Sequence, residues 1–207
     1  MKNITIVMMI PAFLLLSCHP RVATMPDSCC PGHPVTAAPD EPAVASNSIY
    51  QLDGRWTDEN NRLVALQSLK GRVQLVAMIY TYCGYTCPRI IADMKAIRNN
   101  LPAGVRDQVG CVLVTLDPER DTPAQLREFA REQGLDSHWE LLRGSAAQVR
   151  ELSMVLNIQY ANAGNGNISH SAGITVLDRE GRIVRSLQGT GVAGTEVVAE
   201  VGRIAVP

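Results

Sequence analysis

Two adjoining hydrophobic patterns stand near the middle of the chain, an unbroken apolar-rich run at residues 73–80 and a segment of helical periodicity at 84–99. The run predicts a strand buried on both faces. The segment predicts a helix, and Pro88 falls in its first turn, where a proline is tolerated. Cys83 and Cys87 therefore lie where a central strand turns into a helix, about one helical turn apart, so that both sulfurs can face the same side.

The rest of the chain alternates between predicted strands and helices. In chain order these are strands 48–52 and 55–58 joined at Asp53-Gly54, a short strand 62–66, a strand 111–116, a helix from Pro123 to Gly134 capped by Asp121 or Thr122, a helix 145–156 with Val149, Leu152, Val155 and Leu156 inward, a loop 161–171, strands 174–177 and 182–187, and a helix 194–204. This order predicts an α/β, thioredoxin-like fold in which helices flank a central mixed sheet, with an N-terminal β-hairpin and an insertion before the final hairpin.

The N-terminal segment has the pattern of an export signal. Lys2 precedes an apolar run at residues 4–16, which is short for a membrane span and of the right length for a signal-peptide core. The run ends in Leu15-Leu16-Ser17-Cys18, which resembles a bacterial lipobox, with Cys18 as the lipidated residue. An ordinary signal peptide with a chance cysteine, or an uncleaved anchor helix, are the alternatives. Each alternative exports the folded part, and we expect a membrane-anchored lipoprotein of a bacterial cell envelope, facing the periplasm or the outside.

Residues 18–47 are rich in Pro, Ala, Ser, Thr and Asp and show no hydrophobic period. This composition predicts a flexible tether, so the chain divides into a signal peptide at 1–17, the tether at 18–47 and one folded domain at 48–207. The tether contains Cys29, Cys30 and His33, which suggest an accessory metal site or a redox pair. Idle or oxidised thiols are the favoured interpretation, because no structured context fixes these ligands and adjacent cysteines seldom pair with each other.

Composition narrows the class of partner. The formal net charge is -1 and aromatic residues make up 4% of the chain. Neither a basic field for a phosphate backbone nor a set of aromatic platforms for bases is present, so we expect no nucleic acid partner.

The chemistry of the strand-to-helix junction depends on its third ligand. Thiolate is a soft ligand that selects copper(I), zinc or iron-sulfur clusters, and imidazole is its common companion. Of the four histidines, His170 lies in a loop that this topology brings toward the tip of the cysteine helix. Cys83, Cys87 and His170 would suit one trigonal copper(I) ion, whereas zinc would want a fourth ligand. A hydrogen-bonded loop residue is the equally weighted alternative for His170.

Other chemistries fit the same cysteines less well. Thiol-disulfide oxidoreductases of this plan place two residues between their cysteines and a cis-proline before the following strand, but this chain has three intervening residues and no proline between positions 144 and 206. A peroxidatic Thr-x-x-Cys motif would need one residue more between Thr81 and Cys83. We interpret Cys111, Met78 and Met94 as core residues rather than ligands.

With these motifs the chain resembles the Sco/SenC family, the membrane-tethered copper proteins of cytochrome oxidase assembly. The resemblance covers about residues 48–204 and rests on four stretches, which are Cys83-x-x-x-Cys87-Pro88, the segment 116–123 (Leu-Asp-Pro-Glu-Arg-Asp-Thr-Pro), His138-Trp139 with 141–144, and His170-Ser171 before 174–181. It implies a thioredoxin-like fold in which Cys83, Cys87 and His170 bind copper with Asp117 nearby. It also implies delivery of copper to the binuclear centre of a respiratory oxidase subunit or another copper-accepting protein, or reduction of that subunit's cysteines.

The chain departs from the family pattern at two places. Gly84-Tyr85-Thr86 stand between the cysteines where Pro followed by an acidic residue is usual, and Ser169 replaces the usual Asp before the histidine. Both changes remove negative charge while leaving the three ligands in place.

From the three ligands and the family resemblance we expect a metallochaperone that binds one copper ion, copper(I) or copper(II). The alternative is an extracytoplasmic thiol-disulfide reductase or redox sensor in which Cys83 and Cys87 cycle through a disulfide.

Overall fold

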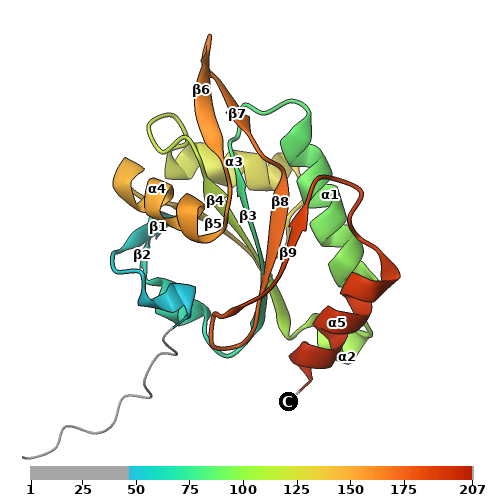
Figure 1. The fold of residues 1–207 in the computed structure, drawn as a ribbon. Coiled ribbons are helices and arrows are strands. Elements are labelled where there is room, and N and C mark those ends of the chain that lie inside the picture. The colour runs from blue at the N-terminus through green and yellow to red at the C-terminus, as the bar shows by residue number, and fades with distance from the viewer. Residues whose placement is uncertain (1–46, 207) are drawn as a thin grey trace, which may run out of the picture. The chain divides into compact units, whose positions relative to one another are not determined.

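A mixed sheet of seven strands, in the order β2-β1-β5-β4-β3-β8-β9, organises the computed structural model, which describes residues 47–206 (Figure 1). Its two central strands pair in parallel over their whole length, from Val73 opposite Val109 to Ile79 opposite Thr115, and all their residues are buried. The strands are β1 (Trp56–Asp58), β2 (Leu63–Val64), β3 (Val73–Ile79), β4 (Val109–Thr115), β5 (Trp139–Arg143), β8 (Gly173–Leu177) and β9 (Ile183–Gln188). The predicted α/β class with a central mixed sheet is confirmed.

Helices cover both faces of the sheet because alternate residues of β3 point to opposite sides. Leu75 and Ile79 belong to one core cluster with residues of α1 (Thr86–Asn99), α3 (Pro123–Glu132) and α5 (Thr195–Ala205). Val76 and Met78 belong to a second cluster, which contains residues of α4 (Ala146–Val155) and of the N-terminal segment. The remaining helical turns are α2 (Ala103–Arg106), η1 (Ile49–Gln51) and η2 (Leu66–Leu69). Among residues 47–206, none of the helices combines the length and apolarity that a membrane crossing requires.

The N-terminal hairpin exists, but the predicted position of its turn was wrong. Strands β1 and β2 pair around residues 58–62, whereas residues 49–51 form a 3₁₀ turn. The Asp58 carboxylate accepts hydrogen bonds from the backbone N–H groups of Asn60 and Arg62 at 2.9 and 2.7 Å, and Asn61 adopts a φ of 62°. The turn of the hairpin therefore lies at residues 58–62, where the Asp58 side chain closes it, and not at Asp53-Gly54 as expected.

Three further predictions are corrected. Strand β5 was not expected, because polar Glu140 interrupts its short apolar pattern. The predicted loop at 161–171 contains a separate two-stranded hairpin, β6 (Tyr160–Gly164) and β7 (Asn167–His170). Val155 of α4 was expected to face inward but is 42% exposed. It is the last residue of the helix, where the buried stripe passes to Leu156.

The predicted signal peptide, tether and lipidation site, with Cys18, Cys29, Cys30 and His33, lie outside the described residues. Within the described part, the sheet brings the candidate ligands together. The loop after β3 carries Cys83, and the loop after β4 starts at the same edge because the two strands are parallel neighbours. Carboxyl ends of adjacent parallel strands are the usual place for a site in an α/β sheet.

Candidate metal centre

The two cysteines lie on either side of the N-terminus of α1. Cys83 is in the turn that leaves β3, where its backbone N–H donates to the Tyr80 carbonyl at 3.2 Å. Cys87 lies in the first turn of the helix, and its backbone N–H donates to the Cys83 sulfur at 3.3 Å. The first N–H groups of a helix have no partner within the helix, so Cys83 satisfies one of these donors. The fully buried Cys87 and the 9% exposed Cys83 are thus held one turn apart, as predicted.

His170 reaches the cysteines from the end of β7. Its Nε2 is 3.5 Å from the Cys87 sulfur, and its Nδ1 is 3.1 Å from the Ser171 carbonyl oxygen. Because a carbonyl oxygen only accepts, Nδ1 must carry the proton in the neutral ring, and the Nε2 lone pair then points toward the sulfur. The Tyr80 ring packs edge-on against the imidazole, with the centroids 5.8 Å apart. The alternative of a hydrogen-bonded loop residue is partly correct, since Nδ1 makes such a bond while Nε2 stays available.

Together the three side chains form a group of metal-ligand character. The two sulfurs and a histidine nitrogen all lie within 4.8 Å of one another. Two atoms bound to one ion at about 2.0–2.3 Å are at most about 4.6 Å apart, so small shifts are enough to close the group on a metal. Two thiolate sulfurs and one imidazole nitrogen form a soft donor set, which fits copper(I). Among residues 47–206, this is the single group of three or more His, Cys, Asp or Glu residues with such geometry.

The two thiols differ strongly in acidity. Burial opposes ionisation of Cys83, but hydrogen bonds from the backbone and thiol of Cys87 and from the Tyr85 backbone lower the pKa of Cys83 to about 6. Burial raises the pKa of Cys87 well above its ordinary value, and the neighbouring Cys83 and Asp121 add to the increase. At neutral pH the site therefore holds one thiolate and one thiol.

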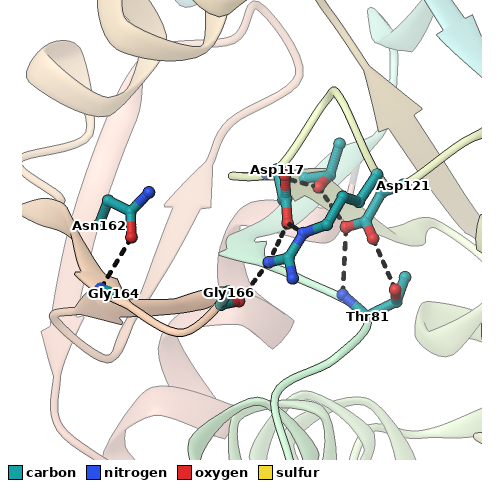
Figure 2. A network of polar contacts seen from close by, with 8 residues as sticks. Thr81, Asp117, Asp121, Asn162, Gly164 and Gly166 are labelled. Carbon is teal, nitrogen blue, oxygen red and sulfur yellow. Dashed lines mark hydrogen bonds and ion pairs between the residues drawn. The ribbon is translucent and has the colours of Figure 1, made fainter.

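Asp121 supports the cysteine loop and was not predicted to do so. It is fully buried, and its carboxylate accepts from the backbone N–H of Thr81 at 3.1 Å, from the Thr81 hydroxyl at 2.5 Å and from the Thr115 hydroxyl at 2.5 Å (Figure 2). Burial raises its pKa, against the effect of these hydrogen bonds. The sequence suggested Asp121 only as a possible helix cap, but Thr122 caps α3. The sequence does contain a signal for this contact, since an acidic residue follows an apolar strand and a threonine precedes the cysteine motif.

Asp117, which the family resemblance places near the metal, lies in the same loop. Its backbone N–H donates to the Thr115 hydroxyl at 2.9 Å, and its carboxylate pairs with Arg120. Its influence on the ligands stays a prediction. Met78, Met94 and Cys111 are at most 1% exposed, which agrees with their interpretation as core residues.

Two exposed tyrosines lie close to Cys83 in the chain. Tyr82 is 56% and Tyr85 is 66% exposed, although both flank Cys83. The guanidinium of Arg89 lies 4.0 Å from the centre of the Tyr85 ring, and that of Arg120 lies 5.1 Å from the centre of the Tyr82 ring. Such cation–π contacts favour these ring positions and give the surface beside Cys83 an amphipathic character.

Comparisons with known proteins agree on one family. The family model described as SCO1/SenC matches residues 45–205. The SCO1 protein homolog of Bacillus subtilis is 29% identical over 138 residues, which are 65% of this chain and 71% of that protein. The copper-bound structure of Bradyrhizobium japonicum ScoI superposes with a TM-score of 0.61 at 28% identity, over 72% of this chain and 96% of that one. A SCO1/SenC family lipoprotein from Bacillus anthracis gives a TM-score of 0.65 at 22% identity, over 73% and 92% of the two chains, and shows the shared fold.

Proposed function

The chain belongs to the SCO1/SenC family, and from this premise we propose that it is a copper metallochaperone that holds one ion between Cys83, Cys87 and His170. The observation that carries the proposal is the convergence of two sulfurs and one imidazole nitrogen within 4.8 Å. The similar protein BsSco is described as a member of the Sco family of cytochrome c oxidase assembly proteins. The acceptor is accordingly a copper-binding protein, and a binuclear copper site in a respiratory oxidase subunit is the specific client that we propose.

The ligands differ in how they take up copper. Cys83 is already ionised at neutral pH and accepts the incoming ion first. Cys87 gives up its proton when it binds, so loading releases a proton from a thiol whose burial makes ionisation costly. The Nε2 lone pair of His170 completes the set. A three-ligand ion retains an open position, where a cysteine or histidine of the acceptor can bind before the chaperone's ligands leave.

We propose a location at the membrane on the basis of the N-terminal sequence. We propose that Cys18 carries a lipid, that residues 18–47 form a tether, and that the domain acts in the bacterial cell envelope, facing the periplasm or the outside. In this compartment reactive thiols need a metal or a reductant to stay reduced. Asp117, at the start of the loop after β4, is proposed to tune the site through the Thr115 and Arg120 contacts of that loop.

A thiol-disulfide reductase is the second candidate, favoured by the low pKa of Cys83. In this reaction the Cys83 thiolate attacks a client disulfide and releases one client thiolate. Cys87 then loses its proton and attacks the Cys83 sulfur, which releases the second client thiolate and leaves a Cys83–Cys87 disulfide. The client gains two electrons, and an external dithiol must return them to the protein.

Anaerobic titration of the reduced domain with copper(I) against a competing chelator tests the proposal. We expect one tight equivalent that weakens strongly in His170→Ala and is unchanged in His138→Ala, a histidine outside the group. Unchanged binding in His170→Ala would exclude the three-ligand site. A reductase would keep its turnover of a client disulfide in His170→Ala and lose it in Cys83→Ser. An adaptor without metal chemistry would tolerate replacement of all three residues.

A further inference from the structure

Two neighbouring residues of the loop after β4 contact the two arms of the site, which are the segment 81–87 with the cysteines and the β6–β7 hairpin with His170. Asp121 accepts hydrogen bonds from Thr81, in the arm that carries the cysteines. Arg120 donates to the backbone carbonyl of Gly166, in the turn of the hairpin that carries His170. Figure 2 shows both sets of contacts, with Asp121 and Thr81 to the right of Asp117 and Gly166 to its left. One loop thus contacts both arms.

The hairpin of β6 and β7 stands apart from the main sheet, and Arg120 is one of the contacts that tie it to the domain. It forms a two-stranded sheet separate from the seven-stranded one. Four of the five residues of β6 are exposed, while Tyr160 and Ile168 pack against the core as partly buried side chains. An isolated two-stranded hairpin is at best marginally stable in water, so its position depends on what ties it to the domain. His170 is its last residue.

Arg120 suits this role because its planar guanidinium binds several partners at once. The Asp117 carboxylate pairs with it and fixes its direction. The Gly166 carbonyl accepts from it, 46 residues along the chain. Its guanidinium also lies 5.1 Å from the ring centre of Tyr82, beside Cys83. The side chain therefore joins the loop after β4, the histidine hairpin and the cysteine loop.

Gly166 is matched to this contact. It has a φ of 75°, and a Cβ at this position would lie 2.6 Å from Nη1 of Arg120. Gly164, in the same turn, has a similar φ of 81°, but a Cβ there would meet nothing within 4 Å. Both positions favour glycine for their backbone conformation, and a Cβ on Gly166 would in addition displace the end of the Arg120 side chain from its present place.

We propose that Arg120 is a positioning residue for the copper site, which acts by holding the β6–β7 hairpin so that His170 Nε2 faces the Cys87 sulfur. The proposal rests on the proposed copper-binding function. Arg120 makes no hydrogen bond or ion pair with Cys83, Cys87 or His170, so its effect on copper is indirect, and the contact with Gly166 assigns it to the hairpin rather than to Tyr82. Arg120 and His170 are therefore expected to be energetically coupled.

A double-mutant cycle on the full domain measures this coupling. Arg120→Ala should weaken copper(I) about tenfold, at the lower end of the effect of residues that orient metal ligands. In the His170→Ala background the same change should have no further effect, because the hairpin then carries no ligand. Arg131→Ala, which removes an exposed arginine paired with Glu128 on α3, is the control and should leave the affinity unchanged.

The glycines of the turn give an independent test. Gly166→Ala should weaken copper binding in the same direction as Arg120→Ala, because its methyl group displaces the guanidinium, whereas Gly164→Ala carries similar backbone strain and should bind copper as the wild type does. An equal loss of affinity in the two glycine variants, or an Arg120→Ala effect that persists in the His170→Ala background, would show that the changes do not act through the position of His170 and would overturn the proposal. If His170→Ala itself binds copper normally, the three-ligand site fails; if it weakens binding while Arg120→Ala does not, only the positioning role fails.

Discussion

At the scale of residues, the site places two chemically identical thiols in opposite states. Cys83 follows the strand and receives hydrogen bonds from the start of α1, while Cys87 is the fully buried residue that donates to it. Hydrogen bonds to a thiolate stabilise its charge, and burial without such bonds favours the neutral thiol. The pair is therefore ready to bind a metal through one sulfur before the second loses its proton.

This asymmetry predicts a pH profile for alkylation of the reduced, metal-free domain. With a pKa of about 6, Cys83 is about nine-tenths ionised at pH 7, so its rate with iodoacetamide should be half-maximal near pH 6 and level above pH 7. Cys87, whose pKa is raised, should react far more slowly. Mass spectrometry of the labelled peptides assigns each rate, and a midpoint near pH 8.5 would contradict the description of the site.

At the scale of elements, the N-terminal hairpin depends on one close approach. A Cβ on Gly144, just after β5, would lie 2.6 Å from the ring of Trp56 in β1, which is 1% exposed. Because the buried ring has no room to move, Gly144→Ala should destabilise the domain by about 1–3 kcal/mol, measured by urea unfolding. Gly104→Ala is the matched control, since nothing lies within 4 Å of a Cβ in α2, and it should be neutral or slightly stabilising. Equal stability of the two variants would contradict this packing.

The elements that could be predicted from sequence are those whose hydrophobic pattern results directly from burial in the core. The run 73–80 and the helical period after it reflect burial in the centre of the sheet, and β3 and α1 lie where they were expected. Strand β5 is short, and parallel pairing with β4 rather than its own pattern makes it a strand. The β6–β7 hairpin has little apolar periodicity because most of it faces solvent. Tertiary contacts determine that β5 and the β6–β7 hairpin are strands, so the local sequence pattern could not predict them.

At the scale of the whole molecule, the site is assembled from segments far apart in the chain. Cys87 and His170 are 83 residues apart in sequence and meet at one edge of the sheet. Soft-ligand chemistry and topology left His170 as a ligand or a hydrogen-bonded loop residue with equal weight, and the family resemblance decided for the ligand. The supporting contacts of Asp121 and Arg120 could not be predicted in the same way, because they depend on the directions in which two adjacent side chains leave one loop.

A metal that joins these segments should stabilise the fold as a whole. A ligand that binds only the folded state, present at 100 times its Kd, adds about 2.7 kcal/mol, which raises Tm by roughly 5–10 °C for a domain of this size. Anaerobic calorimetry of the reduced domain with buffered copper(I) should show this shift. His170→Ala should reduce the shift at the same free copper concentration, since the ion then joins only two ligands one turn apart, and His138→Ala should keep it. A shift of the same size in Cys83→Ser would mean that copper stabilises the domain from somewhere other than the edge where β3, α1 and the β6–β7 hairpin meet.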